Sequence, residues 1–231
     1  MNIHVGTFAS KNFEKQQTRQ AKILLDIGFS QSNIHLFNPT KLDDQFYNSH
    51  PYASDTNKFA WYSFKPYFLE MLLHKIKKGD VLLYLDVNDK PILGIKEYIE
   101  NQFLTWRDLD ILSCGTNYPN FKYLSSFHKS NLSFGLIFES LFLFQPETGA
   151  IAIRNSEKSR SILKIWYELT VINSYLLNQK DYIINPSRPD QETMFIISRI
   201  YKTVKIESWI KFKLLGKGLR KFVQFEALRN F

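Results

Sequence analysis

The sequence predicts an α/β domain, and two observations support this fold class. The chain opens with a short apolar-rich strand at residues 2–7, a helical pattern at 15–27 and a second strand candidate, NIHLF, at 33–37. Strand, helix and strand in this order are typical of a parallel βαβ unit. Further along, VLLYLD at 81–86 is a continuous apolar run of strand length. Such a run indicates a strand that is buried on both faces of a parallel sheet.

The remaining elements follow from hydrophobic spacing and from turn residues. Helices are expected over 63–76, 92–103, 157–178 and 190–202, strands over 136–145 and 149–155, and irregular structure over 111–134. The sequence contains no internal repeat and no low-complexity linker. We therefore expect one domain over residues 1–231, with a basic, aromatic C-terminal segment at 209–231.

Composition restricts the class of protein. The 231 residues are 44% hydrophobic and include one cysteine, Cys114, so an internal disulfide is excluded and a reducing compartment is favoured. No signal peptide and no apolar run of transmembrane length is present, which predicts a cytoplasmic protein. The formal net charge of +8 attracts phosphate groups of any kind.

The turn after the predicted buried strand is the first candidate site. In open α/β sheets the ligand crevice lies at the carboxyl ends of the strands, and Asp86, Asn88 and Asp89 stand directly after one. Their oxygens suit Mg²⁺ or Mn²⁺, which would neutralise a departing nucleotide diphosphate. The alternative is an ordinary polar turn.

Two more clusters combine charge with a predicted helix start. Asp190 either caps the helix that follows or faces a sugar as hydroxyl ligand or base, and the neighbouring Arg188 is suited to a phosphate. Lys65, in the aromatic stretch 61–67, is suited to a phosphate at another helix start. The alternative for the aromatic residues around it is a place in the core. The basic segment 209–225 is either a membrane-surface helix or a tail that packs on the domain.

Five segments, taken in order, resemble a group of small bacterial and viral glycosyltransferases of the GT-A type associated with polysaccharide and lipopolysaccharide synthesis. The family patterns are FGSxNFxxSxxRxxxQA, GYWxWKPYxI, GDILLYLDxG, AGxxxxxNS and RHDQS. The matching segments are TFASKNF at 7–13 with RQA at 19–21, FAWYSFKPYF at 59–68, GDVLLYLDVN at 79–88, GAIAIRNS at 149–156 and RPDQE at 188–192. The match extends over most of the chain, from about residue 5 to about residue 200. The departures are Asn88 in place of Gly or Asp, Pro189 in place of His, and Phe64 in place of the second Trp.

The resemblance implies a GT-A-like, Rossmann-related fold whose mixed sheet has helices on both faces. It also implies a nucleotide-diphosphate sugar as donor, Mn²⁺ or Mg²⁺ as cofactor, and a glycan or lipid-linked acceptor. The implied site residues are Asp190 and Gln191 for catalysis, Thr7, Phe8, Lys11, Lys65 and Arg188 for the donor, and Asp86, Asn88 and Asp89 for the metal. Peripheral contact with the inner membrane face is expected through 209–225.

Two other classes of protein compete with this hypothesis. A nucleic-acid-binding protein or metal-dependent nuclease would use the positive charge and Asp86, but the basic residues are dispersed along the chain except near the C-terminus, so no nucleic acid is expected. A catalytically silent scaffold that docks to a membrane complex would fit the incomplete Asp-x-Asp at 86–88. Metal-dependent hydrolysis of a donor would exclude the scaffold.

Overall fold

The fold was analysed in a computed structural model of the chain. It describes residues 1–51, 53, 62–119, 133–135, 138, 144–177, 189–207, 219 and 223–225. At 117–119, 144, 173–177, 189 and 223–225 only the backbone is described. Arg188 and most of the segment 209–231 therefore lie outside the described residues.

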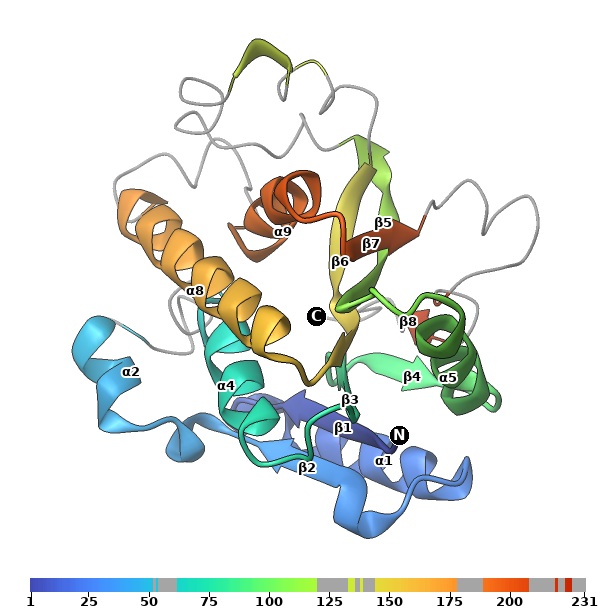
Figure 1. Ribbon diagram of the computed structural model, residues 1–231. Helices are drawn as coiled ribbons and strands as arrows, with labels where there is room; N and C mark the ends of the chain where they lie inside the picture. Colours follow the sequence, from blue (N-terminus) through green and yellow to red (C-terminus); the bar gives the residue numbers. More distant parts are fainter. Residues whose placement is uncertain are drawn as a thin grey trace.

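A six-stranded mixed sheet forms the centre of the domain (Figure 1), in the order β2-β1-β3-β6-β5-β7. β1 pairs in parallel with β2 and β3, β6 runs antiparallel to β3 and β5, and β7 is parallel to β5. The strands are β1 (Ile3–Phe8), β2 (Ile34–Phe37), β3 (Val81–Leu85), β5 (Ile111–Pro119), β6 (Phe144–Arg154) and β7 (Val204–Glu207).

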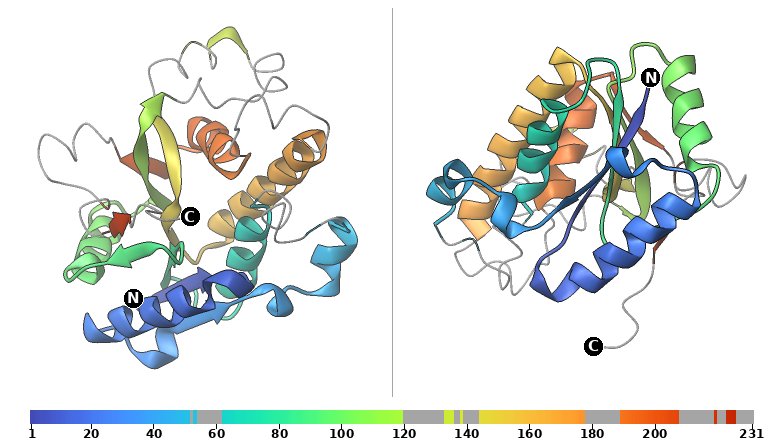
Figure 2. Two further views of the ribbon diagram at one scale, coloured as in Figure 1. Left: turned by 180° about the vertical axis from the view of Figure 1, so that it is seen from behind. Right: turned by 90° about the horizontal axis from the view of Figure 1, so that it is seen from below.

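Helices cover both faces of this sheet (Figure 2), as the sequence predicts. One apolar core lies between the sheet and three helices, α4 (Phe64–Leu73), α8 (Glu157–Leu177) and α9 (Pro189–Ile200). The other core lies between the opposite face and two helices, α1 (Glu14–Asp26) and α5 (Ile95–Thr105). The short helix α2 (Asp44–Ser49) follows β2. Trp166 of α8 is fully buried in the first core.

The opening βαβ unit is confirmed. β1 and β2 pair in parallel with Val5 opposite Ile34, and α1 connects them. The buried run at 81–85 forms β3, all five residues of which are buried, as expected for a strand with a helical layer on each face.

Two expectations for the second half are wrong, and one strand was not expected. The segment 111–119 forms the strand β5 rather than irregular structure, and its pairing with β6 shifts register twice. Such bulges break the alternation of apolar residues, which explains why the local pattern did not indicate a strand. The strand expected over 136–145 is absent where the chain is described, because Phe138 is helical and only the last two residues belong to β6. The strand β7 was not expected.

The C-terminal segment returns to the domain. Leu219 is fully buried and packs in the core beneath α1 and α5. A short strand, β8 (Val223–Phe225), pairs antiparallel with β4 (Asp89–Pro91) in a second, two-stranded sheet. The helical interpretation of 209–225 is therefore wrong at 223–225. Among the described elements, no helix is long and apolar enough to cross a membrane.

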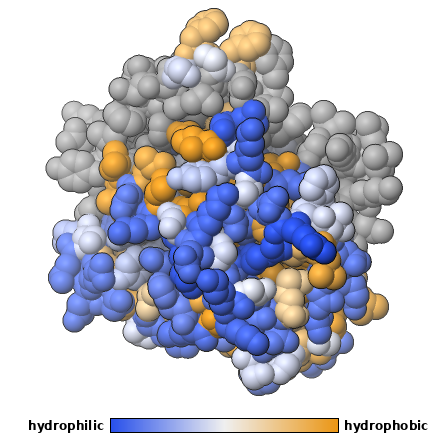
Figure 3. Space-filling view, in the orientation of Figure 1, coloured by the Kyte–Doolittle hydropathy of each residue, from blue (hydrophilic) through white to orange (hydrophobic). Residues whose placement is uncertain are grey.

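The face seen in Figure 3 is mostly hydrophilic, and apolar side chains interrupt it in small patches. Phe134 and Phe138 are strongly exposed, and their rings stack with centroids 6.4 Å apart.

Candidate active site

Polar side chains gather where β3 ends beside the first half of β6. Leu85 pairs with Ala150, and the main-chain N–H of Asp86 donates to the carbonyl of Gly149 at 2.7 Å. Because β6 is antiparallel to β3, its residues 147–149 lie at the same sheet edge as the carboxyl end of β3. This edge is the place where α/β sheets bind their ligands.

Lys65 connects two carboxylates at this edge. It lies in the first turn of α4 with a side chain only 3% exposed, and its Nζ is 3.3 Å from Oδ1 of Asp86 and 3.1 Å from Oδ2 of Asp190. Burial alone would lower the pKa of Lys65, but the charges of Asp190 and Asp86 outweigh burial and raise it. The ammonium group therefore stays charged at neutral pH.

Asp190 is buried at the start of α9. The helix begins at Pro189, so Asp190 lies inside the first turn and is not the residue that precedes the helix. Its Oδ2 accepts a hydrogen bond from Thr148 Oγ1 at 2.5 Å, and its main-chain carbonyl accepts one from Trp166 Nε1 at 3.0 Å. These contacts direct the carboxylate toward Lys65.

Tyr84 orients Asp86. Its hydroxyl donates a hydrogen bond to Oδ1 of Asp86 from a fully buried ring in β3. Burial and the charge of Asp86 raise the pKa of Tyr84 well above its ordinary value, so the hydroxyl keeps its proton and remains a donor.

Three carboxylates face the open side of Gly149. A Cβ atom at this position would lie 2.8 Å from Oδ2 of Asp89, 3.0 Å from Oδ2 of Asp86 and 3.2 Å from Oε1 of Glu147. Glu147 is half-buried, and its Oε1 accepts hydrogen bonds from the N–H of Gly149 and from Nε2 of Gln191 at 3.3 Å. The missing side chain of Gly149 thus leaves a small space that is lined by carboxylate oxygens.

The donor atoms around this space decide whether a divalent metal fits there. Within the described ranges, no three His, Cys, Asp or Glu side chains are grouped so that they could hold a metal ion. Mg²⁺ commonly binds through one or two carboxylates, several waters and the substrate's phosphates rather than in a complete protein cage. The oxygens of Asp86 and Asp89, which face one opening, fit an ion of this kind in donor type.

The predicted nucleotide-binding residues fall into different environments. Thr7 is fully buried at the end of β1, whereas Lys11 is exposed in the short 3₁₀ turn that follows. Phe8 belongs to the core, where its ring stacks on Phe64 with centroids 4.1 Å apart. Packing therefore accounts for the position of Phe8.

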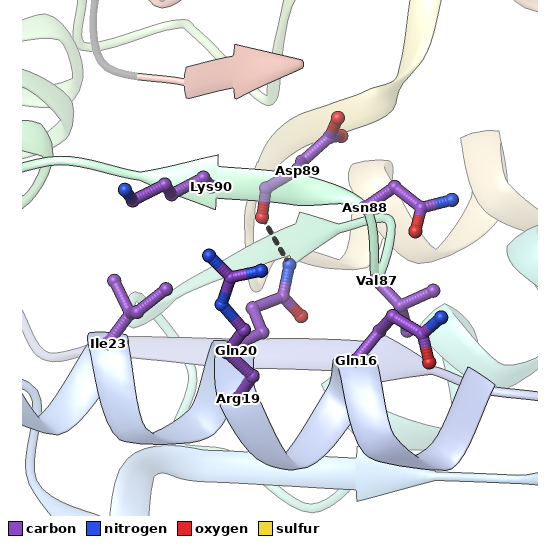
Figure 4. A pocket seen from close by; sticks show the side chains of 8 residues that line it. All are labelled: Gln16, Arg19, Gln20, Ile23, Val87, Asn88, Asp89 and Lys90. Carbon is purple, nitrogen blue, oxygen red and sulfur yellow. Dashed lines mark hydrogen bonds between the residues drawn. The ribbon is translucent and has the colours of Figure 1, made fainter. Parts of the chain in front are cut away.

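Asn88 lies on the α1 side of the turn that follows β3. It lines a small pocket between α1 and the start of β4 (Figure 4). In the same view the carboxyl group of Asp89 points away from α1. The full lining is Gln16, Arg19, Gln20, Ile23, Val87, Asn88, Asp89 and Lys90.

Sequence reasoning missed several residues of this site. Glu147 and Thr148 directly precede the GAIAIRNS segment, and Tyr84 lies within VLLYLD, so both motifs could have drawn attention to them. Gln20 lies in the matched segment RQA at 19–21, but its partners could not be inferred from the sequence, because its contacts are to backbone atoms 66 and 69 residues away.

Comparison with known proteins gives similarity in structure only. No protein-family model matches the sequence, and no curated protein is similar to it in sequence. The galactosyltransferase LgtC, solved with donor and acceptor sugar analogues, aligns with a TM-score of 0.52 and 12% identity, over 88% of this chain and 72% of that chain. The chain therefore has a GT-A glycosyltransferase fold.

Two other solved glycosyltransferases align less closely, with TM-scores below 0.5. A glycosyltransferase involved in glycosylation of the major capsid of PBCV-1 aligns with a TM-score of 0.49 and 10% identity, over 90% of this chain and 83% of that chain. Mouse xyloside xylosyltransferase 1 aligns with a TM-score of 0.47 and 13% identity, over 98% of this chain and 95% of that chain.

Proposed function

We propose that this protein is a glycosyltransferase that moves a sugar from a nucleotide-diphosphate donor to a hydroxyl group of a glycan or lipid-linked acceptor in surface polysaccharide synthesis. The observation that carries the proposal is the buried Lys65 between Asp86 and Asp190 at the carboxyl end of β3, in a chain with a GT-A fold. Buried, paired charges at a ligand-binding edge are typical of functional sites.

In the proposed reaction the acceptor oxygen bonds to the anomeric carbon of the donor sugar while the bond to the diphosphate oxygen breaks. Negative charge develops on the departing diphosphate, so groups positioned to receive that charge accelerate the step. Mn²⁺ or Mg²⁺, held by Asp86 and Asp89, would supply positive charge to the diphosphate. Thr7, Lys11 and Arg188 are proposed to contact the nucleotide. Asn88 is proposed to bind the metal through its amide oxygen.

The role of Lys65 follows from its charge. It compensates part of the negative charge of Asp86 and Asp190, which would otherwise repel each other and the incoming diphosphate. The paired Asp190 can accept a hydrogen bond from a sugar hydroxyl, and Gln191 is proposed to contact the sugar beside it. Both side chains are almost completely buried, so they are held in fixed orientations.

An inverting reaction needs a carboxylate that takes the acceptor's proton. Asp190 is the less suitable base, because its oxygen already contacts the Lys65 ammonium and the Thr148 hydroxyl. Glu147 is partly exposed beside the same opening, whereas the side chain of Asp190 is almost completely buried. We therefore assign the base to Glu147 for an inverting mechanism.

Thermal unfolding in the presence of UDP, GDP, CDP and ADP, with and without Mn²⁺, tests the proposal. A ligand at about 100 times its dissociation constant adds about 2.7 kcal/mol to the free energy of unfolding. We expect one nucleotide to raise the melting temperature in the presence of Mn²⁺, and the matching nucleotide sugar to be hydrolysed slowly without acceptor.

A matched pair of variants makes the test specific to the site. Asp86 follows β3 and Asp80 precedes it, where Asp80 accepts a hydrogen bond from the N–H of Asn2. Asp86→Asn should abolish the nucleotide-dependent shift, whereas Asp80→Asn should keep it. Stabilisation by oligonucleotides in place of any nucleoside diphosphate would reject the transferase and favour the nucleic-acid-binding class.

A further inference from the structure

We infer that Gln20 is a positioning residue that holds Asp86 and Asp89 at the spacing needed for a metal-bound diphosphate; this rests on the proposed function. The side chain of Gln20 projects from α1 and is 2% exposed. Its Nε2 donates to the main-chain carbonyl of Asp86 at 2.7 Å and to that of Asp89 at 2.6 Å. One amide nitrogen thus binds two of the three residues whose carboxylates face Gly149.

The segment between the two carboxylates is a tight turn. The N–H of Asp89 donates to the carbonyl of Asp86 at 2.8 Å, which closes the turn over Val87 and Asn88. A turn closed by a single backbone hydrogen bond can still open or tilt as a unit. Because Gln20 binds the carbonyls at both ends, tilting of the turn would break at least one of its two bonds. Figure 4 shows Gln20 reaching up from α1 to Asp89.

The chemistry of the side chain suits this position. An –NH₂ group has two hydrogens, one for each carbonyl, and carries no charge. A carboxylate here would repel both carbonyl oxygens, and an ammonium group would put a positive charge directly behind the carboxylates. A methionine has nearly the same length and can donate nothing, so Gln20→Met removes the two hydrogen bonds while it retains the volume.

A second glutamine on the same helix supports the interpretation of α1 as a positioning element. Nε2 of Gln17, also buried, donates to the carbonyl of Thr7 at 3.1 Å and to that of Phe37 at 2.8 Å. These carbonyls belong to the carboxyl ends of β1 and β2. Two amides one helical turn apart on α1 therefore hold the strand ends on which the proposed nucleotide and metal sites lie.

Asn155 provides a matched control for the loss of two buried hydrogen bonds. Its Nδ2 donates to the carbonyls of Leu73 and Ile76, both at 2.8 Å, and its buried side chain directly follows β6, which ends at Arg154. Asn155→Leu therefore removes the same kind of interaction without touching the proposed site, together with the hydrogen bond that Asn155 Oδ1 accepts from Arg160 at 2.9 Å. Asn155→Leu should lose at least as much stability as Gln20→Met.

The test is the affinity of the nucleoside diphosphate and Mn²⁺, measured by calorimetry on wild type, Gln20→Met and Asn155→Leu. Groups that orient metal ligands typically contribute 10- to 100-fold in affinity, so we expect a loss of roughly that size in Gln20→Met. The affinity of Asn155→Leu should stay close to that of wild type. In turnover, Gln20→Met should need more Mn²⁺ and donor for half-maximal rate while kcat at saturation is largely retained.

Amide hydrogen exchange tests the same inference without any ligand. The Asp89 N–H should exchange faster in Gln20→Met than in wild type, and at an unchanged rate in Asn155→Leu. Equal affinities and equal Asp89 exchange in the two variants would overturn the role of Gln20 while leaving the proposed function intact. If wild type binds no nucleoside diphosphate with any divalent metal, the proposed function fails first, and the inference fails with it.

Discussion

The Nζ atom of Lys65 lies 3.1 Å from Oδ2 of Asp190, and both side chains are almost completely removed from solvent. The two residues come from helices that are far apart in the sequence, α4 and α9. Charged groups are seldom buried without partners, because the free energy needed to remove a charge from water exceeds the stabilisation that most single contacts provide. The pair therefore makes the site's structure sensitive to loss of either charge.

Lys65→Met should destabilise the fold strongly. It would leave Asp190 charged and buried with Thr148 as its one side-chain partner among the described residues, and breaking a buried pair on one side typically costs about 3–5 kcal/mol. The free energy of unfolding from urea titration at pH 7 measures this loss. Adding Asp190→Asn to Lys65→Met should restore part of it. A double variant less stable than Lys65→Met would argue against the ion pair as the cause.

Gly149→Ala should impair ligand binding with little effect on stability. The new Cβ would meet the carboxylate ends of Asp89 and Asp86, which can rotate away but would then no longer face the opening. Weaker binding of the Mn²⁺–nucleotide complex, with a melting temperature near that of wild type, is the expected result.

Gly6→Ala is the control for that change. Its new Cβ would lie 2.8 Å from Cδ1 of Leu72 in the α4 core, and it would meet the apolar side chains of Leu82 and Phe68 rather than carboxylates. Overpacking a core costs about 1–3 kcal/mol, so Gly6→Ala should lower stability and leave nucleotide affinity unchanged. Weaker nucleotide binding in Gly6→Ala, together with unchanged nucleotide binding in Gly149→Ala, would contradict the site assignment.

The lowered pKa values of two histidines predict that the free energy of unfolding falls in mild acid. Burial, followed by the nearby charges of His4, Lys75 and Lys41, lowers the pKa of His35, and burial lowers the pKa of His50. The unfolded chain therefore takes up protons that the folded chain refuses, so stability should fall as pH drops below about 6.5, the ordinary histidine pKa.

Urea titrations between pH 7.5 and pH 5 measure that slope. Replacing both histidines by glutamine should flatten it. An equally steep slope in the double variant would assign the acid sensitivity to other groups.

Removal of residues 219–231 should loosen β4. The truncation deletes the buried Leu219 and the strand that pairs with 89–91, so amides of β4 should exchange faster than those of β3. Hydrogen exchange with mass spectrometry measures the difference. Protection of β4 equal to that in the full chain would show that β8 contributes nothing to this edge.

The peripheral membrane contact predicted for 209–225 needs a separate measurement. Cosedimentation with vesicles of anionic and of neutral lipid should show binding to the anionic vesicles only, reduced by salt and by removal of residues 209–231. Salt-insensitive binding, or binding that survives removal of residues 209–231, would exclude this segment as the basic contact surface.

Local patterns in the sequence determined the opening βαβ unit, the buried strand β3 and three charged residues of the site. Apolar periodicity and strand length report burial directly, so β1, α1, β2 and β3 lie where the pattern indicates them. Asp86, Asp190 and Lys65 stood out because each is a charged residue at the end of a strand or the start of a helix.

Only the tertiary structure decided how these residues meet. The antiparallel insertion of β6 between β3 and β5 brings Glu147, Thr148 and Gly149 beside Asp86, and no local pattern specifies which strands become neighbours. The bond of Gln20 to the Asp86–Asp89 turn likewise joins a helix and a turn that are 66 residues or more apart. Side-chain periodicity records which face of an element is buried, whereas a hydrogen bond between distant segments depends on where the packed helices and strands place its two ends.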